Sequence, residues 1–151
     1  MGAKELVPPV VHGAVLLSAS EVNGTIWPSK EMNPYHTFQT LKPDEEIDHG
    51  ILVYRGDLHM EAAGAVSRAF LARAELQANR PQEALALAEE AVKLAPDQLF
   101  SRWALGDVAA AAGNKDEARA AYQAAIADAS HLDPERASDY TMYLQAAIKK
   151  L

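Results

Sequence analysis

The sequence predicts a mainly α-helical fold: two helix-turn-helix repeats and a C-terminal capping helix, with a small N-terminal α/β segment packed against them. Two observations predict it. Alanine is rare before residue 62, where only Ala3, Ala14 and Ala19 occur, and it is abundant afterwards. A pattern of small and apolar residues in the second half also recurs after 34 positions. The 151 residues are therefore divided into an α/β segment (1–57), two repeats (58–133) and a capping helix (134–151).

Short apolar runs in the first 57 residues predict strands. Val10–Ser18 and Gly50–Arg55 are expected to be buried strands. Thr25–Trp27 is a candidate edge strand, because the proline that follows it lacks a backbone donor. Asn33 followed by proline predicts a short helix over residues 35–40. Two or three strands do not form a stable sheet alone, so we expect this segment to pack on the helices.

Polar residues separate these elements. Lysine and proline at 42–43, followed by Asp44 and Glu45, predict a turn. The acidic run from Asp44 to Asp48 lacks the glycine and the terminal glutamate of a calcium loop, so it is expected to be a charged turn. Arg55-Gly56-Asp57 marks the boundary with the helices and is too short for a flexible linker. The two parts should therefore form one rigid body.

The helical spacing of apolar residues, and residues that typically begin or end a helix, define the first repeat. One helix is expected from about Asp57 to Ala78 and a second from Pro81 to Leu94. Proline suits the first position of a helix, where its missing N–H is not needed. Asn79 and Gly113 occupy the same repeat position, and both residue types tolerate the left-handed conformation that ends a helix.

A final helix is expected over residues 134–151. Asp133 is its predicted N-cap, because an aspartate side chain can accept a hydrogen bond from the first turn. We interpret this helix as a cap that closes the repeats. Its apolar face comprises Ala137, Tyr140, Leu144, Ala147, Ile148 and Leu151.

The residues that recur after 34 positions carry a resemblance to a known family. The identical pairs are Ser67/Ser101, Arg68/Arg102, Leu71/Leu105, Ala78/Ala112, Glu83/Glu117, Ala84/Ala118, Ala86/Ala120 and Ala91/Ala125. A 34-residue helix-turn-helix period is typical of tetratricopeptide (TPR) proteins, and residues 62–130 resemble that family. Arg68 and Arg102 depart from its pattern, which has an aromatic residue there. The resemblance implies close contact between paired helices at small residues such as Ala84 and Ala118.

In the TPR family, the first helix of each repeat lines a concave groove that binds a protein or peptide partner. Carried onto this sequence, the groove positions are Val66, Ala69, Arg73, Leu76, Gln77, Phe100, Trp103, Asp107, Ala110 and Ala111. The candidate partner-binding residues among them are Arg73, Gln77, Phe100, Trp103 and Asp107. Ala69 and Asp107 do not supply the lysine and asparagine of the family's dicarboxylate clamp, so a chaperone-tail ligand is not expected. Phe100 and Trp103 either anchor a partner or pack against the N-terminal segment.

The N-terminal segment shows a second resemblance. Three stretches carry it, in this order: Gly13-x-Val15-Leu16-Leu17-Ser18-Ala19-Ser20-x-Val22-x-Gly24, Asn33-Pro34-Tyr35-x-x-Phe38-Gln39 and Lys42-Pro43-Asp44-x-x-Ile47-Asp48-His49-Gly50-Ile51-Leu52-Val53-Tyr54. Residues 10–57 thereby resemble the region after the last membrane helix in bacterial relatives of the protein O-mannosyltransferases. This implies an extracytoplasmic, periplasmic tail of a membrane glycosyltransferase, tied to the membrane only through an upstream transmembrane region. The family's catalytic residues lie in loops between membrane helices, which this sequence does not contain.

Composition narrows the function classes. The formal charge of −7 disfavours nucleic acids and anionic membrane surfaces as partners. The chain has no cysteine, which excludes disulfides and thiolate metal sites. Its longest apolar stretch, Val10 to Leu17, is about half of what a membrane span needs. No catalytic, phosphate-binding or metal-binding motif has a recognisable spacing, so we expect no enzymatic activity, no cofactor and no metal ion.

Three functions remain open. The first is a non-catalytic interaction module, as the extracytoplasmic tail of a membrane glycosyltransferase. The second is a stand-alone soluble TPR adaptor in the cytoplasm, and the upstream coding sequence would separate it from the first. The third is a small domain that binds a carbohydrate or a lipid head group between the N-terminal segment and the groove. A groove rich in aromatic residues and open to solvent would favour this third function.

Overall fold

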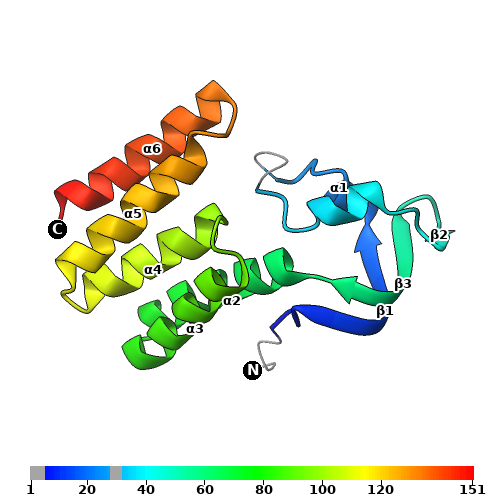
Figure 1. The fold of residues 1–151 in the computed structure, drawn as a ribbon, viewed down its shortest axis with the longest axis horizontal. Coiled ribbons are helices and arrows are strands. Elements are labelled where there is room, and N and C mark those ends of the chain that lie inside the picture. The colour runs from blue at the N-terminus through cyan, green and yellow to red at the C-terminus, as the bar shows by residue number, and fades with distance from the viewer. Residues whose placement is uncertain (1–5, 28–31) are drawn as a thin grey trace.

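The protein is mostly helical, with six α-helices and a three-stranded antiparallel sheet among the described residues (Figure 1). The computed structural model describes residues 6–27 and 32–151. In chain order the elements are β1 (Val10–Ser18), α1 (Ala19–Val22), the 3-10 helix η1 (His36–Thr40), β2 (Glu45–Ile47), β3 (Ile51–His59), α2 (Glu61–Gln77), α3 (Pro81–Leu94), α4 (Leu99–Ala111), α5 (Lys115–Ala129) and α6 (Pro134–Lys149). The predicted combination of a large helical part with a small α/β segment is confirmed.

The sheet has the strand order β1-β3-β2, and both pairs are antiparallel. The third strand is Glu45–Ile47, where a turn was predicted, while the predicted edge strand Thr25–Trp27 is a turn. Two hydrogen bonds explain the difference. The backbone N–H of Asp44 donates to the Val53 carbonyl at 2.8 Å, and its carboxylate accepts from the N–H of Arg55 at 2.7 Å. These two contacts hold the acidic run against β3.

Strand β3 continues through the predicted boundary between the two parts of the chain. Arg55, Gly56 and Asp57 all pair with residues of β1, so the expected helix start at Asp57 is wrong. Helix α2 begins at Glu61 instead. The reason is that β1 offers each of these residues a backbone partner. Hydrogen bonding across the strands outweighs the tendency of the local sequence to end the strand at Gly56.

The β1–β3 ribbon bends sharply near its middle (Figure 1). Gly13 and Gly56 lie opposite each other in the ribbon, with φ angles of 137° and 118°. Residues with a side chain rarely adopt such angles, so glycine permits the bend. The bend directs one end of the ribbon toward α2 and the other toward α1 and η1 (Figure 1).

Helices α2 and α3, and helices α4 and α5, form two hairpins with short turns. Asn79 follows α2 with φ 60°, and Gly113 follows α4 with φ 82°, so both predicted left-handed residues are confirmed. In each turn, the next residue donates its backbone N–H to a carbonyl five positions earlier, at 2.9 Å. Pro81 is the first residue of α3, as predicted.

Small residues let the helices of each hairpin pack closely. Ala84 and Ala118, which occupy the same repeat position, are both fully buried. Gly106 of α4 lies against the ring of Tyr122 of α5, and a Cβ at this glycine would be 2.5 Å from two ring carbons. Ala72, at the corresponding position of α2, is also fully buried. These positions therefore set how closely the paired helices approach.

Helix α6 packs on α5 and closes the helical part (Figure 1). The Asp133 carboxylate accepts a hydrogen bond from the backbone N–H of Arg136 at 3.2 Å, which confirms the predicted N-cap. Leu144 is fully buried. The rest of the predicted apolar face packs against the same cluster, through Ala137, Tyr140, Ala147, Ile148 and Leu151.

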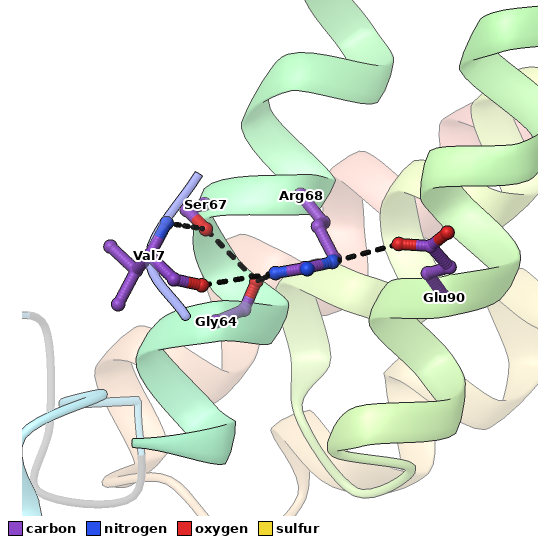
Figure 2. A network of polar contacts seen from close by, with 5 residues as sticks. All are labelled: Val7, Gly64, Ser67, Arg68 and Glu90. Carbon is purple, nitrogen blue, oxygen red and sulfur yellow. Dashed lines mark hydrogen bonds and ion pairs between the residues drawn. The ribbon is translucent and has the colours of Figure 1, made fainter. Parts of the chain in front are cut away.

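A polar network fastens the start of the chain to the helices (Figure 2). The Ser67 hydroxyl accepts from the N–H of Val7 at 3.2 Å and donates to the Gly64 carbonyl at 2.9 Å. Arg68 Nη1 donates to the carbonyls of Val7 and Gly64 at 3.0 and 3.1 Å. Its Nε donates to the carboxylate of Glu90 in α3 at 2.9 Å. Arg68 therefore links the segment ahead of β1 to both α2 and α3.

Met32 is a second attachment between the two parts. Its side chain is 1% exposed and belongs to the same apolar cluster as Leu99, Leu132 and Leu144 of the helical part. The N-terminal segment therefore contributes to the core of the helices. This shared core supports the expectation of one rigid body.

We expect Gly13→Ala and Gly56→Ala each to lower the free energy of unfolding by about 1–3 kcal/mol, because a side chain strains the backbone at positive φ. Neither added Cβ would meet another atom within 4 Å, so backbone strain is the only cost. Gly50→Ala is the control, since φ there is not in this range and the nearest atom is 3.8 Å away. Denaturant unfolding measures all three variants. Equal stability of the three would contradict the assigned bend.

Met32→Ala should lower the free energy of unfolding by about 2–5 kcal/mol, as truncation of a buried methionine usually does. Circular dichroism at a helical wavelength should report this loss, because Met32 packs among the helices. Met142→Ala is the control: its side chain is 57% exposed, and its substitution should change stability by less than about 0.5 kcal/mol. Helices that unfold as in the unaltered protein after Met32→Ala would show that the core is not shared.

Candidate functional site

Five aromatic side chains from α2, α4 and α6 form a continuous surface, which we call the aromatic surface: Phe70, Phe100, Trp103, Tyr140 and Tyr143. Ring centroids are 5.5 Å apart for Phe70 and Phe100, 6.5 Å for Phe100 and Tyr140, and 6.0 Å for Trp103 and Tyr140. Phe70 is 47% exposed and Tyr143 is 60% exposed. Three helices thus present large apolar rings to solvent at one place.

A pocket of about 230 Å³ opens within the aromatic surface. Its walls are Trp103 of α4 and Arg136, Asp139, Tyr140 and Tyr143 of α6. The rings supply an apolar wall, while the arginine and the aspartate add one charge of each sign. Such a pocket can hold an apolar side chain and bind a polar group beside it.

Arg73 and Asp107 form the polar border of the aromatic surface. Arg73 Nε lies 3.0 Å from Asp107 Oδ2, and the guanidinium stacks over the Trp103 ring at 5.1 Å from its centroid. The Tyr122 hydroxyl donates to Asp107 Oδ1 at 2.9 Å. Asp107 thereby holds the arginine of α2 and the tyrosine of α5 around one carboxylate. This arrangement fixes one face of the Trp103 ring.

Burial raises the pKa of the Asp107 carboxyl, although the Tyr122 hydrogen bond and the charge of Arg73 act in the opposite direction. Burial also raises the pKa of the Tyr122 hydroxyl, and the neighbouring Asp107 charge raises it further. The tyrosine therefore remains a hydrogen-bond donor at neutral pH. The raised pKa of Asp107 means that the free-energy cost of removing its carboxylate from water exceeds the stabilisation that Tyr122 and Arg73 provide.

The structure brings together four of the five candidate partner-binding residues that were predicted from the sequence. Phe100, Trp103, Arg73 and Asp107 are neighbours through ring contacts or the ion pair. Gln77 is the last residue of α2 and is exposed. Trp103 is half-buried: Arg73 of α2 and Tyr140 of α6 contact its ring, and it packs against the apolar cluster that includes Met32 of the N-terminal segment.

Sequence reasoning missed Phe70, Tyr140 and Tyr143 as members of this surface. Tyr140 was assigned only to the packing face of the last helix, yet its ring also lies against Trp103. Phe70 lies one helical turn before Arg73, and this spacing was an available signal that the two share a face.

A larger cavity of about 450 Å³ lies where the N-terminal segment meets the helices. Its lining comes from η1, from the start of α2, from the connection between α3 and α4, and from the end of α5 and the residues after it. The lining residues are His36, Ala62, Ala95, Asp97, Gln98, Asp128 and His131. Sequence reasoning did not find it, because no motif connects residues from four separate segments.

The described residues hold no group of three His, Asp or Glu side chains that could bind a metal ion. Among residues 6–27 and 32–151, no helix is both long enough and apolar enough to cross a membrane. Aromatic and charged side chains, rather than metal ligands, therefore define the two candidate sites.

Changing Asp107 to asparagine should stabilise the protein increasingly as pH rises. The folded-state pKa of Asp107 lies above its ordinary value, so ionisation costs stability from about pH 4 up through the raised pKa. At acid pH both variants carry a neutral group, and their stabilities should converge. Tyr122→Phe removes a hydrogen bond that lowers the pKa of Asp107. The Tyr122→Phe variant should therefore lose more stability with rising pH than the unaltered protein does. Denaturant unfolding across pH measures both, and a constant difference between Asp107→Asn and the unaltered protein would contradict the assignment.

Comparison with known proteins gives no match. No protein-family model, no curated protein and no solved structure is similar to this chain at a significant level.

Proposed function

We propose that this chain is a non-catalytic TPR module that binds a protein or peptide partner in a groove formed by α2, α4 and α6. Contacts that recur with the repeat support the assignment. Arg68 bonds Glu90, and Arg102 Nη1 donates to the carbonyl of Ala124 at 3.3 Å, both 22 residues further along. Equivalent residues thus reach equivalent places in the following helix, as stacked copies of one unit do. The two left-handed turn residues recur with the same spacing.

The observation that carries the binding proposal is the exposed aromatic surface. Phe70 and Tyr143 expose about half or more of their side chains, beside rings that are already positioned by Arg73 and Tyr140. Aromatic and arginine side chains dominate the energy of protein interfaces. Because Trp103 and Tyr140 are held by their neighbours, little conformational entropy would be lost when a partner binds.

The pocket at Trp103 favours a particular kind of contact. A partner's apolar side chain would enter between the rings of Trp103 and Tyr143, and the adjoining backbone would meet Arg136 and Asp139. The two opposite charges suit the donors and acceptors of a peptide backbone better than they suit a single formal charge. A peptide with one buried anchor residue is therefore the expected ligand.

In this proposal the module is the soluble extracytoplasmic tail of a membrane glycosyltransferase and has no catalytic role itself. The three stretches behind that resemblance form one connected unit, which supports treating them together. Asn33 Nδ2 donates to the carbonyls of Glu21 and Val22 at 3.0 and 3.1 Å, and Gln39 Nε2 donates to Val22 at 2.8 Å. An upstream coding sequence with apolar spans would favour this setting over a stand-alone adaptor.

Selection of peptides from a random display library tests the binding function. The expected result is a consensus motif with an apolar or aromatic anchor, and a synthetic peptide of that sequence should bind the unaltered protein. Tyr143→Ala should weaken this binding at least about tenfold, equivalent to about 1.4 kcal/mol, because it removes one wall of the pocket.

Met142→Ala provides the matched control. Met142 is 57% exposed, close to the 60% of its neighbour Tyr143, but it does not line the pocket. Its substitution should leave peptide affinity unchanged. The groove proposal fails if no consensus emerges, or if the two variants weaken binding equally.

A further inference from the structure

The cavity between the N-terminal segment and the helices differs in chemistry from the aromatic surface. It measures about 450 Å³, a usual size for a small-molecule site. Among the described residues, its lining combines two carboxylates, two imidazoles and one amide with two alanines. No aromatic ring of the proposed groove lines it, so it is a separate site.

Asp97 and Asp128 form the acidic side of the cavity. Asp128 is 15% exposed at its side chain, and its buried Oδ2 accepts no hydrogen bond from the described residues. Arg102 Nε lies 3.3 Å from that oxygen, as an ion pair without hydrogen-bond geometry. Burial raises the pKa of Asp128; Arg102 opposes this change, and the charge of Asp97 adds to it. Oδ2 itself is covered, so a cation in the cavity would meet the accessible part of the Asp128 side chain, where its charge would favour the ionised carboxylate.

Gln98 supplies a hydrogen-bond donor on the same lining. The residue is only 5% exposed, and its Oε1 accepts from the N–H of Phe100 at 3.4 Å, which caps α4. No described residue accepts a hydrogen bond from its Nε2. A nearly buried amide therefore has its donor hydrogens available to an oxygen atom of a ligand.

His36 adds an acceptor from the N-terminal segment. Its Nδ1 lies 2.9 Å from the Asn33 carbonyl, which can only accept, so Nδ1 carries the hydrogen. In the neutral ring, Nε2 is then an acceptor. The cavity thus offers acceptors at His36, Asp97 and Asp128 and a donor at Gln98.

We propose that this cavity binds a small primary ammonium compound that carries hydroxyl groups, such as an amino sugar or an amino alcohol. The Asp128 and Asp97 carboxylates attract the ammonium group, and a hydroxyl oxygen of the ligand accepts a hydrogen bond from Gln98 Nε2. Anions are disfavoured by the two carboxylates. A metal ion is disfavoured as well, because no three potential ligands among the described residues are suitably placed.

Titration with D-glucosamine, followed by amide spectra of the whole protein at neutral pH and constant ionic strength, tests the proposal. Saturable shifts are expected at Ala62, Gln98 and His131, which line the cavity. D-glucose is the matched probe, since it differs only in carrying a hydroxyl in place of the ammonium group, and it should give no saturable shift. Ethanolamine tests the contribution of the ring: equal affinity would support an amino alcohol, and weaker affinity an amino sugar.

Asp128→Asn should weaken D-glucosamine binding at least tenfold. Asp133→Asn is the control, because it removes the same charge nearby, does not line the cavity and keeps an N-cap residue for α6. If Asp128→Asn does not fold, Asp97→Asn takes its place, since Asp97 is exposed. Absence of saturable shifts, equal binding of D-glucose, or equal losses in the Asp128 and Asp133 variants would overturn the proposal. Tyr143→Ala should not affect it, which separates this site from the groove.

Discussion

Attachment of the N-terminal segment to the helices is the constraint on which the rest of the structure depends. A small sheet with one three-residue strand buries little apolar surface by itself, and it gains stability by packing against a helix. Met32 enters the apolar cluster of the later helices, Ala63 of α2 belongs to the apolar cluster of the sheet, and Arg68 and Ser67 bind the backbone of Val7. The cavity lined by His36 and Gln98 exists only because these two parts meet.

Small residues between paired helices determine where the large residues go. Gly106 admits the ring of Tyr122, whose hydroxyl then reaches Asp107 on α4. Asp107 in turn positions Arg73, and Arg73 covers one face of Trp103. The close packing at Gly106 is thus connected, through Tyr122, Asp107 and Arg73, to the orientation of the Trp103 ring on the surface. The groove and the core are parts of one network rather than separate features.

Arg68 and Arg102, which lie 34 residues apart, make comparable contacts. In both helices the guanidinium reaches across to the following helix, and in both it is mostly covered, with 14% and 27% of the side chain exposed. The aliphatic part of an arginine can fill the space of a ring while its head group bonds to backbone carbonyls. At Arg68 those bonds include the carbonyl of Val7, so this arginine also serves the attachment of the chain's first part.

The helices, their turns and the N-cap at Asp133 were predictable from sequence, because propensity, capping and small-residue spacing act within one turn of the chain. Arg73, Phe100, Trp103 and Asp107 were named from the repeat positions of the TPR family, and the structure brings these four side chains together. Strand β2, the passage of β3 through Gly56, and the bend opposite Gly13 were not predictable, because each depends on backbone pairing with another strand and not on the local sequence alone. The cavity likewise required the tertiary structure, since its carboxylates, imidazoles and amide come from segments that only folding brings together.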